Sequence, residues 1–324
     1  MSTEVPNGSR DGGVVLSVIF VNYNTRDLTL RAIEALRQEI GRVPFDVETI
    51  VVDNASVDGS LEAIASGCPE VVLIASRQNL GFGRGNNLGA DFASGELLLF
   101  LNTDTEIRAG ALSAIVSLFQ TQREVGAVGA RLENPDGTHQ PSAILVPSLW
   151  RIFCEFFWLD RTGLPRFSGM FPNGFDPDSE QDIEAAHGAA LAVRRDLFDE
   201  IGRFDPDYFM YFEEADLCTR IAERGYRIRY TPEAVVMHHV SASSGDRPWW
   251  FFRAMRRSRM IFVRKHLSGA SLVLLPLLVH SGYAMRIVLF GAAGLFSSRL
   301  RSLGRRMARS YVDRSGPDRG EERG

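Results

Sequence analysis

The sequence predicts an α/β protein whose mostly parallel sheet is covered by helices on both faces. Short apolar runs rich in β-branched residues alternate with helix-like segments through the first half of the chain, as is typical of such a sheet. Polar residues gather directly after these runs, where open α/β sheets bind their ligands. With 324 residues and 45% apolar content, the chain can build one large domain with an appendage.

The individual elements follow from hydrophobic periodicity. Strands are predicted at 14–21, 47–52, 71–75, 97–101 and 126–132. Helices are predicted at 27–39, 60–66 and 109–122, with a further helix at 85–93 that is entered through glycines. Residues 134–184 lose this period and are rich in Pro, Gly and aromatic residues, so we expect an insertion or lid on the acceptor side of a site. Regular structure is expected again from residue 185.

Charge divides the chain into further regions. Residues 247–312 hold twelve arginines and one lysine without any acid, although the net charge of the chain is -4. The apolar runs 267–285 and 287–296 accompany these cations, which favours an anionic membrane surface over nucleic acid as the partner. We expect an interfacial or re-entrant helical pair, with a single membrane span or a soluble core or oligomer contact as alternatives. Residues 1–13 and 313–324 are expected to be disordered, and 14–246 to form the α/β domain.

Two common classes of site are excluded by their residues. Three separated cysteines, without a CxxC motif, give neither a disulfide framework nor a zinc ribbon. The glycines at 81, 83 and 85 follow the third predicted strand and do not match GxGxxG, and no P-loop lysine is present. Dinucleotide binding and Walker-type ATP hydrolysis are therefore not expected.

The candidate site residues follow four successive strands. Any one of these polar clusters is explained by turn or cap chemistry, but four together indicate a site. The candidates for binding a donor are Asn22, Tyr23, Asn24, Asp53, Asn54, Ser56, Gly81, Gly83, Arg84, Asn87, Asn102 and Thr103.

The order and spacing of five segments resemble a known family. They read Val-Asn-Tyr-Asn at 21–24, Val-Asp-Asn-Ala-Ser-Val-Asp-Gly at 52–59, Asn-Leu-Gly-Phe-Gly at 79–83, Phe-Leu-Asn-Thr-Asp at 100–104 and Tyr-Phe-Glu-Glu-Ala-Asp-Leu-Cys-Thr-Arg at 211–220. Together they resemble the inverting family-2 glycosyltransferases of the GT-A fold, in the bacterial rhamnosyltransferase branch. The resemblance implies a GT-A domain over 14–246 that binds a nucleotide-sugar.

The resemblance also implies a divalent metal, Mg²⁺ or Mn²⁺. Asp104 stands at the last acid of the family's Asp-x-Asp motif, whose first acid is Asn102 here, so the donor diphosphate would supply much of the coordination. A histidine completes the metal site in several relatives, and His238 fits that place better than His239. A structural histidine is the alternative.

The resemblance gives two further parts of the donor site. Asp53 would accept a hydrogen bond from the pyrimidine base, and Asn22 and Asn24 would frame the nucleoside. The alternative for Asp53 is a loop acid that begins an Asx turn. Gly188 and Ala189 belong to a small-residue turn beside the sugar, where tight core packing is the alternative.

Inversion in one displacement needs a carboxylate that removes the acceptor's proton. Glu213, Glu214 and Asp216 are the candidates, although acids in a first helical turn are favoured by the dipole and Asp216 can pair with Arg220. The resemblance favours Glu214 as the base, with Asp216 in reserve.

The expected function is transfer of a sugar, L-rhamnose from dTDP-rhamnose, to a lipid-linked or cell-surface glycan. The protein would act at the cytoplasmic face of the inner membrane, as a peripheral or monotopic protein that binds no nucleic acid. The alternatives are a transferase that uses a UDP-hexose, and a nucleotide-sugar-binding scaffold that has lost catalysis.

Overall fold

The structure is a computed structural model of the chain, and it describes residues 15–239, 249–293, 297–298, 302–305 and 308–309. Both segments expected to be disordered, 1–13 and 313–324, lie outside the described residues. So do several stretches of the basic region at 247–312.

Ten strands form one sheet in the order β3-β2-β1-β4-β11-β6-β12-β5, with β7 paired to β6 and β9 paired to β12. The strands of this sheet are β1 (Leu16–Asn22), β2 (Val47–Asp53), β3 (Val72–Ala75), β4 (Leu97–Leu101), β5 (Thr105–Ile107), β6 (Val125–Glu133), β7 (His139–Gln140), β9 (Gln181–Asp182), β11 (Ala190–Arg194) and β12 (Arg227–His238). A separate pair joins β8 (Ala143–Ile144) to β10 (Ala185–Ala186).

The direction of the strands places the predicted site residues at one edge. Strands β3, β2, β1 and β4 are mutually parallel, and Asn22 at the end of β1 pairs in register with Asp53 at the end of β2. Strand β11 runs antiparallel to both β4 and β6, whereas β12 is parallel to β6. The four parallel strands therefore bring the ends of three candidate segments together.

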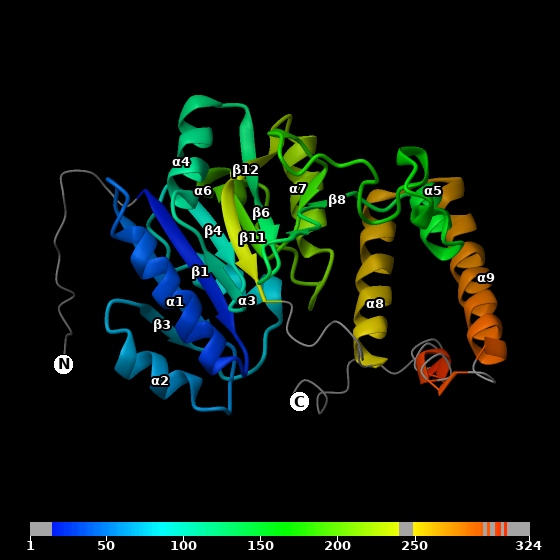
Figure 1. The fold of residues 1–324 in the computed structure, drawn as a ribbon, viewed down its shortest axis with the longest axis horizontal. Helices are drawn as coiled ribbons and strands as arrows, with labels where there is room; N and C mark the ends of the chain where they lie inside the picture. Colours follow the sequence, from blue (N-terminus) through cyan, green and yellow to red (C-terminus); the bar gives the residue numbers. More distant parts are fainter. Residues whose placement is uncertain (1–14, 240–248, 294–296, 299–301, 306–307, 310–324) are drawn as a thin grey trace.

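Helices cover both faces of the sheet, which confirms the predicted fold class (Figure 1). The helices of the first face are α1 (Arg26–Ile40), α2 (Ser60–Gly67) and α4 (Ala111–Thr121). The helices of the second face are α3 (Phe82–Ala90), α6 (Arg195–Glu200) and α7 (Glu213–Glu223). Successive side chains of β1 point to opposite faces of the sheet. Val18 and Phe20 therefore pack in the core of the first face, and Ile19 packs in the core of the second.

Helix α3 begins at Phe82, three residues before the predicted start at 85. The glycines that suggested a loop are helical because the helix lies very close to β1. A Cβ at Gly85 would lie 2.8 Å from Val21 Cγ1, and one at Gly89 would lie 2.5 Å from Ile19 Cγ2. Only small residues fit where α3 packs on β1. This close packing also brings the loop before α3 next to the end of β1.

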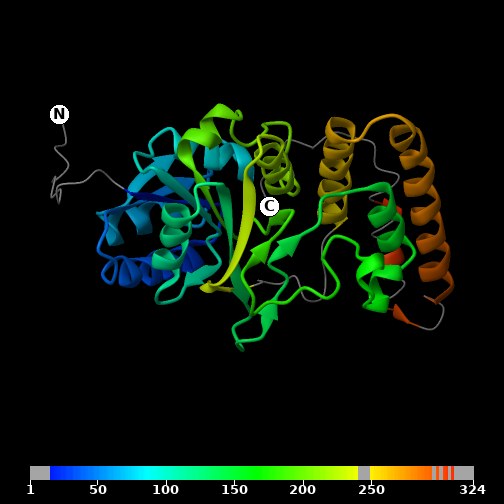
Figure 2. The ribbon, with the colours of Figure 1, turned by 90° about the horizontal axis from the view of Figure 1, so that it is seen from above.

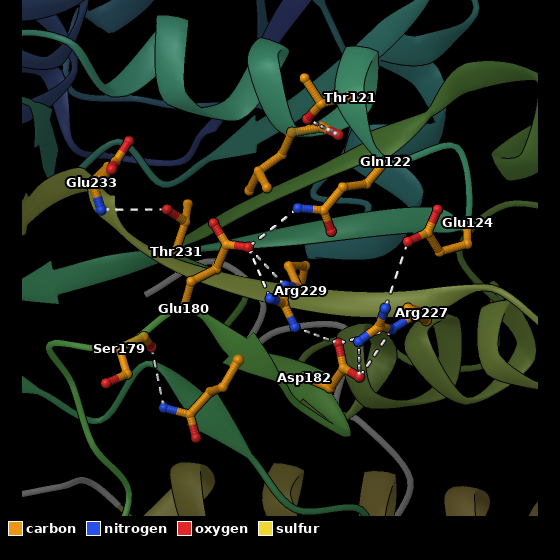
Figure 3. A network of polar contacts seen from close by, with 12 residues as sticks. Thr121, Gln122, Glu124, Ser179, Glu180, Asp182, Arg227, Arg229, Thr231 and Glu233 are labelled. Carbon is orange, nitrogen blue, oxygen red and sulfur yellow. Dashed lines mark hydrogen bonds and ion pairs between the residues drawn. The ribbon is translucent and has the colours of Figure 1, made fainter.

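The region 134–184 folds into short elements that include β7, β8, β9, α5 (Leu149–Phe156) and the 3₁₀ turns η1 (Leu159–Thr162) and η2 (Pro165–Phe167). A network of ion pairs fastens its end to the sheet, as Figure 3 shows. Arg227 of β12 contacts Asp182 of β9, and Arg229 contacts both Glu180 and Asp182. A single exposed ion pair contributes little to the free energy of folding. The role of the network is therefore to fix the position at which the 134–184 region rejoins the sheet.

In the described part of the chain, the long helices α8 (Trp249–His266) and α9 (Ala270–Ala293) follow the sheet. In both views α8 lies between α7 and the α5–α9 pair (Figures 1 and 2). It joins two cores, because Phe262 packs with α7 whereas Val263 packs with α5 and α9. Residues Ala270–Ala292 are long and apolar enough to cross a membrane, and 22% of the window is buried inside the protein.

The close packing of α3 on β1 can be tested at Gly89. We expect Gly89→Ala to lower the free energy of unfolding by about 1–3 kcal/mol, because the added methyl group overlaps Ile19. Gly67→Ala in α2 is the matched control: no atom lies within 4 Å of its added Cβ, so stability should stay equal or rise by up to about 1 kcal/mol. Urea unfolding measures both, and equal effects would contradict the packing described.

Candidate functional site

The first part of the site is a polar corner at the ends of β1 and β2. Asn22 is fully buried, and its Nδ2 donates to Asp53 Oδ1 at 2.7 Å and to Ser56 Oγ at 2.9 Å. The backbone N–H of Asn24 donates to the same Ser56 hydroxyl at 3.0 Å. Asn22, Asn24, Asp53 and Ser56, four of the candidate donor-binding residues, therefore form one hydrogen-bonded unit. Tyr23 lies between them, half-buried.

Asn54 fixes the glycine loop that precedes α3. Its Nδ2 donates to Asn79 Oδ1 at 3.0 Å and to the Gly81 carbonyl at 3.2 Å, while its Oδ1 accepts from Leu80 N at 2.9 Å. Gly81 has a φ of +79°, and a Cβ there would lie 2.1 Å from the Phe209 carbonyl oxygen. Only glycine permits this approach of two backbones.

Four other candidates have different surroundings. Arg84 is exposed on α3, and the side-chain amide of Asn87 exchanges two hydrogen bonds with the Phe204 backbone, at 2.8 and 3.1 Å. Asn102 N donates to the Ala189 carbonyl at 3.0 Å, and Thr103 Oγ1 lies 2.9 Å from Thr25 Oγ1. Asn87 therefore joins α3 to the loop that contains Phe204, and the 102–103 segment borders the turn that contains Ala189.

Asp104 and His238 lie side by side. Asp104 Oδ1 is 3.3 Å from His238 Nε2, and His238 Nδ1 lies 2.9 Å from Gln140 Oε1. Gln140 Nε2 donates to the His238 carbonyl at 2.8 Å, which orients the amide so that Oε1 accepts from Nδ1. When the ring is neutral, Nε2 therefore presents a lone pair toward Asp104. A histidine that ligates a metal typically has this arrangement, with its other nitrogen donating to a fixed oxygen.

The neighbouring histidine points elsewhere. His239 Nε2 lies 2.8 Å from Glu106 Oε1, so it is His238 that faces Asp104. In the described part of the chain, no group of three or more His, Cys, Asp or Glu side chains is arranged to hold a metal ion. One carboxylate and one imidazole nevertheless fit a divalent cation if phosphate oxygens complete its coordination.

His187 is a site residue that the sequence candidates omitted. Its ring centre is 5.8 Å from that of His238, and its Nδ1 accepts from the Ala189 N–H at 3.1 Å. Burial lowers the pKa of His187 to about 4, and the charge of His238 acts in the same direction. A neutral imidazole therefore borders the Asp104–His238 pair.

The three acids at the start of α7 point to different surroundings. Glu214 lies against Gly188, where an added Cβ would be 3.7 Å from Glu214 Cδ. Glu213 lies against Gly83, where an added Cβ would be 3.7 Å from Glu213 Cβ. In the turn at 187–189, His187 thus borders the Asp104–His238 pair, and the next residue, Gly188, borders Glu214.

The protonation states of the two glutamates differ. Burial, followed by the charge of Glu214, raises the pKa of Glu213 well above its ordinary value. Burial raises the pKa of Glu214 to about 7. One carboxyl oxygen of each residue, Oε2, is buried without a hydrogen-bond partner. Both pKa values are therefore raised, and within this coupled pair the pKa of Glu213 is raised further than that of Glu214.

Asp216 is fully buried away from these two acids. Arg220 Nη2 lies 2.7 Å from its Oδ2, and Lys265 Nζ and His266 Nε2 lie 2.8 and 2.7 Å from its Oδ1. Burial acts to raise the pKa of Asp216, but the hydrogen bond from His266 and the charges of Arg220 and Lys265 outweigh it and lower the pKa to about 2. An anion that contacts an arginine, a lysine and a histidine in this way is suited to fixing α7 in place.

The sheet topology and the sequence define the class of protein: a glycosyltransferase with the GT-A fold. The chain belongs to glycosyl transferase family 2, whose model matches residues 17–202, and the expected family is thereby confirmed.

Two curated relatives are rhamnosyltransferases. The chain is 29% identical over 304 residues to the N-acetylglucosaminyl-diphospho-decaprenol L-rhamnosyltransferase of Mycobacterium tuberculosis, an alignment that covers 89% of this chain and 97% of the relative. It is 25% identical over 185 residues to the rhamnosyltransferase WbbL of Escherichia coli K12, covering 54% of this chain and 66% of that protein.

Two solved structures share the fold at low sequence identity. The crystal structure of GalNAc-T7 with UDP, GalNAc and Mn²⁺ matches with a TM-score of 0.57 at 14% identity, over 79% of this chain and 48% of that one. The chain thus spans about half the length of GalNAc-T7. Staphylococcus aureus TarS 1-349 matches with a TM-score of 0.50 at 16% identity, over 79% of this chain and 68% of that one.

Proposed function

We propose that the protein is an inverting transferase that moves L-rhamnose from dTDP-rhamnose to a lipid-linked glycan acceptor. The observation that carries transfer is Glu214, a buried carboxylate with a pKa of about 7 beside the Gly188 turn. Similarity along nearly the whole length of a rhamnosyltransferase that acts on a polyprenyl diphosphate supports the sugar and the acceptor.

Each part of the site has a role in this reaction. Asp53, held by Asn22, would accept a hydrogen bond from the pyrimidine base of the donor. Asp104 and His238 would hold Mg²⁺ or Mn²⁺, which supplies positive charge for the diphosphate leaving group. Glu214 would remove the proton from the acceptor hydroxyl as that oxygen attacks the anomeric carbon. Glu213 would stay protonated at the pH at which Glu214 ionises, so Glu214 would be the acid of the pair that accepts the proton.

We also propose attachment to the cytoplasmic face of the inner membrane, and the C-terminal helices support contact with a membrane surface. One face of α9 packs on α5 through Leu275, Val279 and Tyr283, which are all nearly buried. Arg286 lies on the same face and donates to the carbonyls of Glu155 and Phe156. Apolar side chains are exposed over much of the remaining surface of α9, beside His280 and Ser281, and they are Leu272, Val273, Leu274, Leu277, Val288 and Leu289. Protein on one side and apolar side chains on the other suit a monotopic helix in the interface.

The donor and the base can be tested together. Purified protein is assayed for nucleotide release with dTDP-rhamnose and UDP-hexoses, using a polyprenyl-diphospho-N-acetylglucosamine acceptor. We expect turnover with dTDP-rhamnose, and NMR should show an anomeric configuration opposite to that of the donor. Activity should rise with pH through about 7, because Glu214 must lose its proton to act as a base. Turnover only with a UDP-hexose would change the donor, and donor binding without turnover would indicate a scaffold.

Glu214→Gln should keep donor affinity and lower kcat by about 10²–10⁴-fold, the usual contribution of a positioned base. Glu213→Gln is the matched control, since the amide replaces a carboxyl that is already protonated at neutral pH. Its kcat should stay near that of the wild type. If Glu213→Gln abolishes transfer and Glu214→Gln does not, the two roles are exchanged.

The metal is tested by chelation and by two histidine variants. Excess chelator and Asp104→Ala should each lower activity by about 10²-fold or more. His238→Ala should weaken Mn²⁺ binding in the presence of nucleotide, measured by calorimetry, more than His239→Ala, whose ring faces Glu106. Full activity in chelator would show that the transferase needs no metal, and the opposite order of the variants would reassign the ligand.

The membrane surface is tested with vesicles of phosphatidylethanolamine and phosphatidylglycerol. The combined change Val273→Ser, Leu277→Ser and Val288→Ser should lower the partition coefficient at least about tenfold, because three exposed apolar side chains lose their burial in lipid. Phe92→Ser, also at an exposed apolar side chain but on the α/β domain, should leave sedimentation with vesicles unchanged. Equal partitioning of all three proteins would contradict the assignment to α9.

A further inference from the structure

The turn that leads into α7 has an unusual backbone. Tyr211 and Phe212 have φ values of 71° and 68°, in the left-handed region that residues with side chains rarely adopt. Two such residues in succession are strained and persist only where the surroundings hold them. They directly precede Glu213 and Glu214, so whatever holds this turn also sets the direction of both glutamates.

One side of the turn is held by the glycine loop. Phe82 N donates to the Phe209 carbonyl at 3.0 Å, which places the start of the turn against the donor side of the site. This contact leaves the opposite side of the turn to be held by another element.

Helix α8 covers the opposite side. Ser258 Oγ donates to the Met210 carbonyl at 2.7 Å, and the Ser258 side chain is almost completely buried. Phe262 packs its ring 6.3 Å from that of Phe212. These contacts come from two successive turns of α8, so the helix lies along the turn and fixes it at more than one point.

The C-terminal end of α8 then reaches α7 itself. His266 Nε2 donates to Asp216 Oδ1 at 2.7 Å, and Lys265 Nζ lies 2.8 Å from the same oxygen. Lys265 also contacts Asp205 at 2.5 Å, in the loop before the turn. Because Asp216 is two residues after Glu214 on one helix, an anchor at Asp216 sets the rotation of α7 and hence the direction of Glu214.

We propose that α8 is a positioning element of the transfer reaction, and that His266 and Lys265 hold Glu214 against the Gly188 turn through Asp216. This inference rests on the proposed role of Glu214 as the base. Asp216 lies two residues after Glu214, about 200° further round α7, so we expect its partners His266 and Lys265 to act through the helix and not on substrate. Their effect should appear in the chemical step and not in donor binding.

The test compares three variants of the full chain with the wild type. His266→Ala should lower kcat by about 10- to 100-fold, the size of effect produced by a base displaced by about 1 Å, with KM for the donor changed less than about twofold. His266→Gln keeps an N–H that can donate to Asp216, and it should restore most of the loss. Arg264→Ala removes an exposed charge from the same turn of α8 and should match the wild type.

Hydrogen exchange of the same proteins gives a second readout. Amides of 209–216 should exchange at least about tenfold faster in His266→Ala than in Arg264→Ala, while β1 and β2 stay unchanged. If His266→Ala does not fold, Lys265→Met, which leaves the His266 contact in place, is measured with the same expectations.

Normal kcat in folded His266→Ala, or loss of kcat that His266→Gln does not restore, would overturn the proposal. Absence of transfer by the wild type on every donor would instead refute the proposed function. In that case faster exchange at 209–216 would still support the anchoring by α8, and unchanged exchange would overturn it.

Discussion

The site depends on the close contact between the Gly81 loop and the Phe209 carbonyl. A side chain at position 81 would overlap that oxygen at 2.1 Å, so the two backbones can meet only because Gly81 has no Cβ. The contact joins the parallel half of the sheet, which ends in Asn22 and Asp53, to the segment that leads into α7. The residues suited to the donor and the acid suited to the acceptor are thereby held at a fixed separation, as a single displacement requires.

Three acids within four residues illustrate how surroundings decide the chemistry of a carboxyl group. Burial is the largest influence on the carboxyl groups of Glu213 and Glu214, so their pKa values rise. Asp216 has no solvent exposure either, yet Arg220, Lys265 and His266 lower its pKa. The same first helical turn thus supplies two carboxyl groups whose pKa values are raised and one whose pKa is lowered. Local sequence contains the acids, whereas their protonation states come from residues elsewhere in the fold.

Sequence patterns predicted the parts that depend on local order. The parallel strands and the polar clusters at their ends follow from periodicity and turn residues, and the structure brings Asn22, Asp53 and Ser56 together. Other features depend on contacts between distant segments. The start of α3 was placed too late because its glycines serve packing on β1. His187 was omitted because only the fold brings it beside His238, and nothing near Asp216 in sequence indicates that its partners are residues 265 and 266.

The position of α8 between α7 and the α5–α9 pair affects the order in which the protein can be completed during synthesis (Figure 1). The N-terminal part of a chain leaves the ribosome first, so the whole sheet can form before α8 has emerged. The turn at 210–212 and Asp216 then form their contacts with Ser258, Phe262 and His266 only after α8 has emerged. A nascent chain that stops before residue 266 would carry every candidate site residue without the full set of contacts from α8. The contacts that we propose to position Glu214 would therefore form late in translation.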